Sequence, residues 1–136
     1  MYYIAQLVII DTDILIDFSL DRSDAVVTMS NLEDKFILNI SVITAMELYA
    51  GCRSKKDLNR VDELISDIYI EFVTKPISLQ AFELMKEFRS NYGVEINDML
   101  IAAASMNLEA KLISKNQKYY KFLPGIDLLE YPLSGV

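Results

Sequence analysis

Short apolar segments that alternate with helical patterns constrain the fold of this chain more than any other feature of its sequence. The segment LVII (7–10) is a continuous apolar run, which is typical of a strand buried on both faces of a parallel sheet. Further strands are predicted at 36–39, 70–74, 111–114 and 126–130. Because strands that alternate with helices form parallel sheets covered on both faces, we expect a three-layer α/β/α domain whose central, mainly parallel sheet has about five strands.

Helices are predicted from apolar residues at helical spacing and from residues that cap helix ends. Ser41 is a suitable N-cap for a helix that Gly51 can end, and the segment SKKD (54–57) resembles a capping box. Asn97 is a candidate N-cap for the apolar segment DMLIAAASMNL. The expected helices begin near residue 13 and cover 22–33, 42–51, 54–68, 79–93 and 98–108.

Length and composition favour a single domain over residues 1–136. Hydrophobic residues make up 52% of the chain, which excludes a disordered protein, and 136 residues can bury a core without disulfides. The single Cys52 cannot form an internal disulfide, and no apolar stretch approaches the ~18 residues of a membrane span. We therefore expect a cytoplasmic protein that has no membrane partner.

The chain contains no histidine, which excludes several kinds of hydrolytic site. Catalytic triads, cysteine–histidine pairs and histidine zinc sites all need a residue that is absent here. Any hydrolytic site in this chain must then consist of carboxylates, together with a cation that prefers oxygen ligands. The net charge of −7 argues against a protein that binds nucleic acid over its whole surface. Two clusters of basic residues could still form a local basic rim.

Two acids interrupt the most hydrophobic part of the sequence. Asp11 and Asp13 follow the first predicted strand directly, and an unpaired buried carboxylate costs free energy. Asp11 lies at the carboxyl end of that strand, where α/β sheets of this kind bind ligands. A helix N-cap would also account for Asp11.

Two more acids lie in predicted helices that are apolar on nearly every side. Glu47 should be buried there without a cationic partner nearby, so it must be neutral, paired or bound to a cation. Asp98 begins another such helix, where it could simply complement the helix dipole. Three acids that converge from Asp11, Glu47 and Asp98 would repel each other unless a divalent cation joined them.

Four segments in order along the chain are similar to the successive signatures of PIN domains, particularly VapC-type toxins. They run from about residue 8 to residue 132 and read VIIDTDILIDF, ISVITAMELYAG, INDMLIAAASMN and LISKNQKYYKFLPGIDLL. The resemblance implies a metal-dependent endoribonuclease of a toxin–antitoxin system that uses Mg²⁺ or Mn²⁺. It also implies an RNA substrate, a homodimer, and a VapB-type antitoxin whose tail enters the catalytic groove.

The resemblance assigns roles to individual residues. Asp11, Glu47 and Asp98 match the family's acids, which coordinate the cation and a water that attacks an RNA phosphodiester bond. Supporting positions beside these ligands are expected for Asp13, Asn116 and Ser41.

The chain departs from the family pattern at one position. Many members carry a fourth acid directly before an aromatic residue, and here Tyr119 occupies that place, followed by Tyr120. Tyrosine is a poor ligand for Mg²⁺ at neutral pH because its ordinary pKa is near 10. An alternative function is therefore a PIN fold that binds RNA or an antitoxin with reduced or lost catalysis.

Two other α/β classes fit the sequence less well. The DTD segment also resembles the start of haloacid-dehalogenase-type phosphatases, but Leu15 is unusual for that family and Glu47 has no role in it. A phosphoreceiver domain fits worse, because nothing matches its phosphorylated aspartate.

Overall fold

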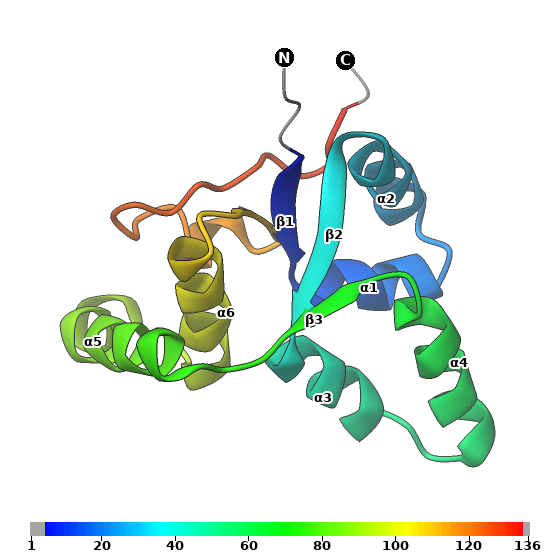
Figure 1. Ribbon diagram of the computed structural model, residues 1–136, viewed down its shortest axis with the longest axis horizontal. Coiled ribbons are helices and arrows are strands. Elements are labelled where there is room, and N and C mark those ends of the chain that lie inside the picture. The colour runs from blue at the N-terminus through cyan, green and yellow to red at the C-terminus, as the bar shows by residue number, and fades with distance from the viewer. Residues whose placement is uncertain (1–4, 135–136) are drawn as a thin grey trace.

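The computed structural model of this protein describes residues 5–134 (Figure 1). Its sheet has four strands in the order β3-β2-β1-β4, and every pair is parallel. The strands are β1 (Gln6–Ile10), β2 (Phe36–Ser41), β3 (Tyr69–Glu71) and β4 (Lys111–Ile113). The predicted parallel α/β/α class is confirmed.

The prediction of a fifth strand at 126–130 is wrong. This segment forms only an isolated parallel bridge, between Leu112 and Leu128. Two backbone hydrogen bonds hold it: Leu112 donates to Asp127, and Leu129 donates to Leu112, both at 2.8 Å. Because β4 is itself only three residues long, it offers little edge for a longer pairing.

Helices cover both faces of the sheet, as Figure 1 shows. Ile9 of β1 packs with α5 and α6, whereas its neighbours Val8 and Ile10 pack with the helices of the opposite face. This alternation follows from the pleat of a strand that is buried on both sides. One layer contains α5 (Lys75–Tyr92) and α6 (Ile96–Asn107), and the other contains α1 (Thr12–Ser19), α2 (Ser23–Lys35), α3 (Val42–Ala50) and α4 (Lys55–Ile65).

Most of the predicted helix ends are confirmed. The Ser41 hydroxyl accepts a hydrogen bond from the Ile43 N–H at 3.1 Å, and Ser54 caps α4 in the same way. Gly93 ends α5 in the left-handed conformation, with φ of 64°, which only glycine adopts without strain. Within residues 5–134, no helix has the length and apolar character that crossing a membrane requires.

The predicted Asn97 cap is wrong. Helix α6 begins at Ile96, two residues before the predicted start at Asp98, and its N-cap residue is Glu95. The Asn97 side chain instead donates to Glu47 Oε2 at 3.4 Å, so its amide is engaged across the sheet edge. This places Asn97 beside the predicted acids.

The ends of several elements meet at one edge of the sheet. In Figure 1 the strands β1 and β2 run down to the side from which α3 continues and at which α6 begins. Parallel strands bring their carboxyl ends to a common edge, so residues distant in sequence meet there. The predicted acids lie at this edge.

Candidate active site

Asp11 is fixed by hydrogen bonds from both ends of the chain. It is 6% exposed and follows β1 directly as the N-cap of α1, where Oδ1 accepts from the Thr12 N–H at 2.8 Å. Its Oδ2 accepts from the Ser114 hydroxyl at 2.7 Å and from the Tyr120 hydroxyl at 3.0 Å. Its own N–H donates to the Ile113 carbonyl at 2.9 Å. Asp11 therefore caps a helix and also lies at the centre of a polar cluster.

Asp98 approaches Asp11 through a shared tyrosine hydroxyl. It lies in the first turn of α6 and is half-buried, with Oδ1 3.3 Å from the Tyr120 hydroxyl oxygen. Since Asp11 Oδ2 is 3.0 Å from the same atom, the two carboxylate oxygens cannot be farther apart than the sum of these distances. The fold thus brings two acids separated by 87 positions to either side of one hydroxyl.

Glu47 joins the cluster from α3 through polar side chains. Its Oε1 accepts from the Thr12 hydroxyl at 2.8 Å, and its Oε2 accepts from Asn97 at 3.4 Å. The expectation that Glu47 is buried is wrong in degree: it is half-buried, and its neighbour Met46 is exposed, because α3 extends beyond the end of the sheet. The partners of Glu47 are neutral and come from other elements.

Asp13 lies next to Asp11 and shares one of its partners. Its Oδ2 is 3.2 Å from the Ser114 hydroxyl and accepts from the Lys115 N–H at 3.2 Å. Its Oδ1 is buried and has no hydrogen-bond partner within the described residues. Asp13 therefore retains an unused acceptor oxygen beside the cluster.

The other two predicted residues, Asn116 and Ser41, support the cluster indirectly. Asn116 is exposed and donates its N–H to the Ser114 hydroxyl at 3.0 Å, which orients the serine toward Asp11. Ser41 is 1% exposed and caps α3, the helix that carries Glu47. Neither residue makes a side-chain hydrogen bond to the three acids in the part of the chain that the structure describes.

Burial and mutual repulsion raise the pKa values of Asp11, Asp13 and Asp98. Burial raises the pKa of Asp11, against the opposing effect of its hydrogen bonds from Ser114, Thr12 and Tyr120. Burial and then the charge of Asp11 raise the pKa values of Asp13 and Asp98 to about 6. Burial also raises the pKa of Tyr120, as do both neighbouring acids, so its hydroxyl stays neutral. Among residues 5–134, no lysine or arginine side chain forms an ion pair with Asp11, Asp13, Glu47 or Asp98.

These shifts predict that the cation-free protein is more stable at pH 5 than at pH 7.5. A carboxyl with a raised pKa binds its proton more tightly when folded, so its ionisation destabilises the fold above about pH 6. After a reduction for solvent screening, the free energy of unfolding should rise by about 1–2 kcal/mol on acidification. Urea unfolding in EDTA at the two pH values measures this, and equal or lower stability at pH 5 would contradict it.

Asp98→Asn tests whether repulsion among the carboxylates lowers the stability of the cation-free protein. At pH 7.5 without metal, the variant should be as stable as the parent or more stable, by about 1 kcal/mol, because it removes a repelled charge. It should also lose divalent-cation binding, as followed by thermal melts with and without Mg²⁺. A large loss of stability without metal would assign Asp98 a role only at the helix N-terminus.

The donor set fits a hard divalent cation. All three predicted ligands are carboxylates, the kind of oxygen ligand that Mg²⁺ and Mn²⁺ prefer. Burial, with repulsion from neighbouring acids, raises the pKa values of two of them, Asp11 and Asp98, as expected for carboxylates that lack a cation. Within residues 5–134, however, no three acidic or thiol side chains already lie at the distances of a finished metal site. Instead, the Tyr120 hydroxyl lies between Asp11 and Asp98, and Thr12 contacts Asp11 through its N–H and Glu47 through its hydroxyl.

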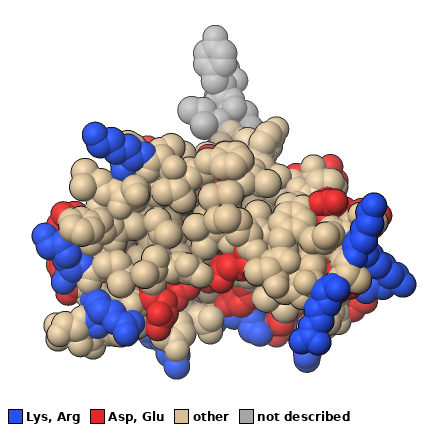
Figure 2. Space-filling view, turned by 90° about the horizontal axis from the view of Figure 1, so that it is seen from below, with Lys and Arg blue, Asp and Glu red and all other residues tan. Residues whose placement is uncertain are grey.

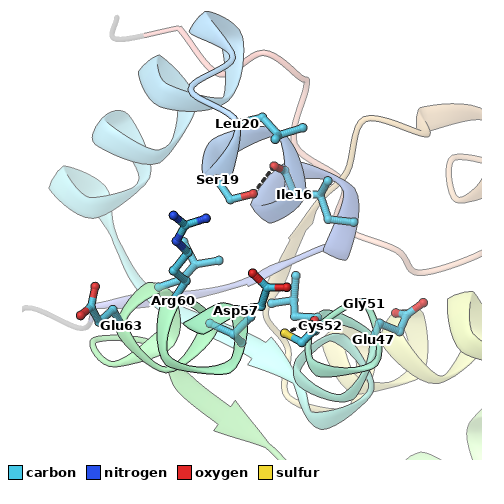
Figure 3. A pocket seen from close by; sticks show the side chains of 12 residues that line it. Ile16, Ser19, Leu20, Glu47, Gly51, Cys52, Asp57, Arg60 and Glu63 are labelled. Atoms are coloured by element: carbon cyan, nitrogen blue, oxygen red, sulfur yellow. Dashed lines mark hydrogen bonds between the residues drawn. The ribbon is translucent and has the colours of Figure 1, made fainter. Parts of the chain in front are cut away.

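The side of the molecule at which the strands end is mostly uncharged. Figure 2 views this side and shows acidic atoms near its middle, with basic side chains toward its edges. A cleft of about 670 Å³ opens beside the acids between α1, α3 and α4, and Glu47 and Arg60 lie at opposite ends of it (Figure 3). Its walls are largely apolar and include Ile16, Leu20, Leu48, Val61 and Leu64.

Four polar residues of the cluster were not predicted from the sequence: Thr12, Asn97, Ser114 and Tyr120. Thr12 and Ser114 lie within the segments DTD and SKN, which the resemblance already singles out, and this is the signal that the sequence offers for them. Tyr120 gave no such signal, because it was matched only to an aromatic position. Its hydroxyl contributes the contact that links Asp11 to Asp98.

Residues 8–122 match the family described as PIN domain, so this chain belongs to the PIN domain family. Among curated relatives, a protein named Ribonuclease VapC19 from Mycobacterium tuberculosis is 27% identical over 120 residues, which cover 87% of this chain and 95% of the relative. A protein named Ribonuclease VapC from Rickettsia bellii is 25% identical over 135 residues, or 92% of this chain and 96% of that one.

Solved structures of similar fold come from toxin–antitoxin complexes. A chain of a toxin–antitoxin complex from Klebsiella pneumoniae is 27% identical and has a TM-score of 0.74. The alignment covers 93% of this chain and 98% of the Klebsiella chain. A chain of VapBC2 from Rickettsia felis, solved with a DNA fragment from its promoter, has a TM-score of 0.78 at 23% identity, with coverage of 91% and 98%. The second similarity supports the fold alone.

Proposed function

We propose that this protein is a metal-dependent endoribonuclease, the toxin of a VapBC-type toxin–antitoxin system. The observation that carries the proposal is the meeting of Asp11 and Asp98 at one hydroxyl, with Glu47 held next to them. The names of the relatives, ribonucleases and toxin–antitoxin complexes, support the same activity. The cytoplasm is the proposed place of action.

Asp11, Glu47 and Asp98 would hold one Mg²⁺ or Mn²⁺ ion. The bound ion would offset their charge and lower the pKa of a water, so that the water can attack an RNA phosphodiester. Ser114 and the Thr12 N–H orient Asp11, while the Thr12 hydroxyl and Asn97 orient Glu47. These contacts fix the direction in which the carboxylates present their oxygens.

The charge distribution suits an RNA strand that crosses the acidic centre. A chain of net charge −7 repels RNA over most of its surface, so attraction must be local. Basic side chains toward the edges of the view in Figure 2 would contact phosphates on either side, while the middle carries the acids. Binding should therefore weaken steeply with salt.

The cleft beside Glu47 is the proposed docking site of the antitoxin. Ile16 and Leu20 are exposed on its apolar wall, and Glu47 belongs both to the cleft and to the acid cluster. The apolar residues of an antitoxin segment would cover the apolar wall of the cleft, and a basic residue of the same segment would neutralise the charge of the acids. This agrees with the structural similarity to chains of toxin–antitoxin complexes.

A second exposed apolar surface would serve a homodimer. It runs over β3 and α5, where the sheet edge and the helix leave large side chains open to solvent. Its members are Tyr69, Phe72, Leu79 and Phe82. A symmetric pairing through this surface would leave the acid cluster free.

The proposal predicts cleavage of single-stranded RNA that depends on Mn²⁺ or Mg²⁺. Purified protein, free of antitoxin, should cut an end-labelled RNA at internal positions when Mn²⁺ is added, and EDTA should stop the reaction. Intact RNA under saturating Mn²⁺, together with retained RNA or antitoxin binding, would support the alternative, a binding module without catalysis. The observation that favours this alternative is that, within residues 5–134, no three acidic or thiol side chains lie at the distances of a finished metal site.

A further inference from the structure

Tyr120 places a hydroxyl in the middle of the proposed metal site. The residue is 1% exposed, and its backbone N–H donates to the Gln117 carbonyl at 3.1 Å. Its ring packs in the same core as Leu112 and Leu123. The hydroxyl is therefore fixed by the surrounding core, and it can move only with the ring or with the turn that precedes it.

The Tyr120 hydroxyl uses acceptor capacity that a cation would need. The two oxygens of a carboxylate offer about four lone-pair positions. On Asp11, the Thr12 N–H occupies one position on Oδ1, and the hydroxyls of Ser114 and Tyr120 occupy both on Oδ2. Asp11 Oδ2, the oxygen that Tyr120 links to Asp98, thus has no free lone pair to offer a cation.

The same hydroxyl also does part of what a cation would do. It presents a partial positive charge toward Asp11 at 3.0 Å and lies 3.3 Å from Asp98, so it lowers the repulsion between them. A tyrosine hydroxyl carries only one proton and cannot donate fully to both acids at once. It is a weaker bridge than a divalent ion, and it occupies the same position between the two carboxylates.

We propose that the Tyr120 hydroxyl occupies the space between Asp11 and Asp98 in the cation-free protein, and that a divalent cation binds there only by displacing it. Tyr120 is then a positioning residue that sets the affinity of the site. This inference rests on the proposed function, because it concerns the same carboxylates. Its consequence is a site that stays ordered without metal but binds metal more weakly than the three acids alone would.

Tyr120→Phe tests the inference, because it removes the hydroxyl and keeps the ring in the core. Calorimetric titration with Mn²⁺ alone should show about tenfold tighter binding to the variant, since a hydrogen bond to an ionised group contributes a free energy of that order. Tyr119→Phe is the matched control: Tyr119 is 39% exposed, and its hydroxyl makes no hydrogen bond within the described residues. The control should bind Mn²⁺ as the parent does.

A second measurement follows the hydroxyl itself. With tyrosines labelled at the ring carbon that carries oxygen, NMR should show one resonance of the eight tyrosines shifting on addition of Mg²⁺. That resonance should be missing from Tyr120→Phe and present in Tyr119→Phe. A purely structural role for Tyr120 would leave this resonance unmoved by Mg²⁺.

The possible results separate the inference from the proposed function. Tighter Mn²⁺ binding by Tyr120→Phe, with circular dichroism like that of the parent, supports the displacement. Equal or weaker binding by the variant overturns it and leaves the metal site standing. If neither the parent nor Tyr120→Phe binds Mn²⁺, the metal site itself is refuted and the inference with it.

Discussion

Asp11→Asn is expected to lower Mn²⁺-dependent RNA cleavage by about a hundredfold or more. The substitution removes one negative charge from the three carboxylates that would hold the cation, and a neutral amide is a poor substitute for a carboxylate toward Mg²⁺ or Mn²⁺. Asparagine is as good an N-cap as aspartate, so the start of α1 should be retained. The loss should therefore appear in activity and cation binding, while the melting temperature changes little.

The control for this variant is Asp24→Asn. Asp24 is an exposed acid in the first turn of α2, so the same chemical change is made outside the cluster. Initial rates of cleavage on one end-labelled RNA should be equal for Asp24→Asn and the parent. If Asp11→Asn cleaves as fast as both, the activity belongs to a contaminating ribonuclease or to another site.

Tyr119→Asp is expected to raise Mn²⁺-dependent cleavage by about ten- to a hundredfold. The resemblance places the family's fourth acid at this position, and it implies that tyrosine leaves the leaving-group oxygen less well stabilised. One preorganised electrostatic contact of this kind is worth about 10²–10³ in rate elsewhere, which sets an upper bound here. Since Tyr119 is substantially exposed, the change should leave the core intact.

Tyr119→Asn separates the charge from the loss of the ring. Asparagine matches aspartate in size but is neutral, so the proposal predicts no gain in cleavage rate for it. Rates at several Mn²⁺ concentrations show whether Tyr119→Asp also lowers the concentration needed for half-maximal cleavage. If the parent and Tyr119→Asp both leave RNA intact at saturating Mn²⁺, the protein is a binding module.

The strands and most helix ends could be predicted because local chemistry determines them. The apolar run at 7–10 has few alternatives to a buried strand, and Gly93 ends its helix through its own backbone freedom. The segment 126–130 has three apolar residues and two acids, and it pairs at only one point. Its extent depends on the short length of β4, which the residues of 126–130 do not encode.

The sequence predicts the acids of the candidate site, but it does not predict their hydrogen-bond partners. Asp11, Glu47 and Asp98 stand out because each interrupts or borders an apolar run, which is a local pattern. Asn97 was assigned to a helix end, whereas its amide contacts Glu47 across 50 positions. Tyr120 was assigned only an aromatic role, because nothing local indicates where a tyrosine hydroxyl will point after folding.

The hydrogen bonds of Asp11 have a consequence for the synthesis of the protein. Two of its partners, Ser114 and Tyr120, lie 103 and 109 positions further along the chain. During translation the first acid is made early, but its carboxylate cannot be oriented until nearly the whole chain has left the ribosome. We therefore expect a growing chain to be inert toward the RNA around it, and a prematurely terminated one to remain so. On the proposed function, ribonuclease activity would arise only in the fully translated chain, at the stage when an antitoxin can bind it.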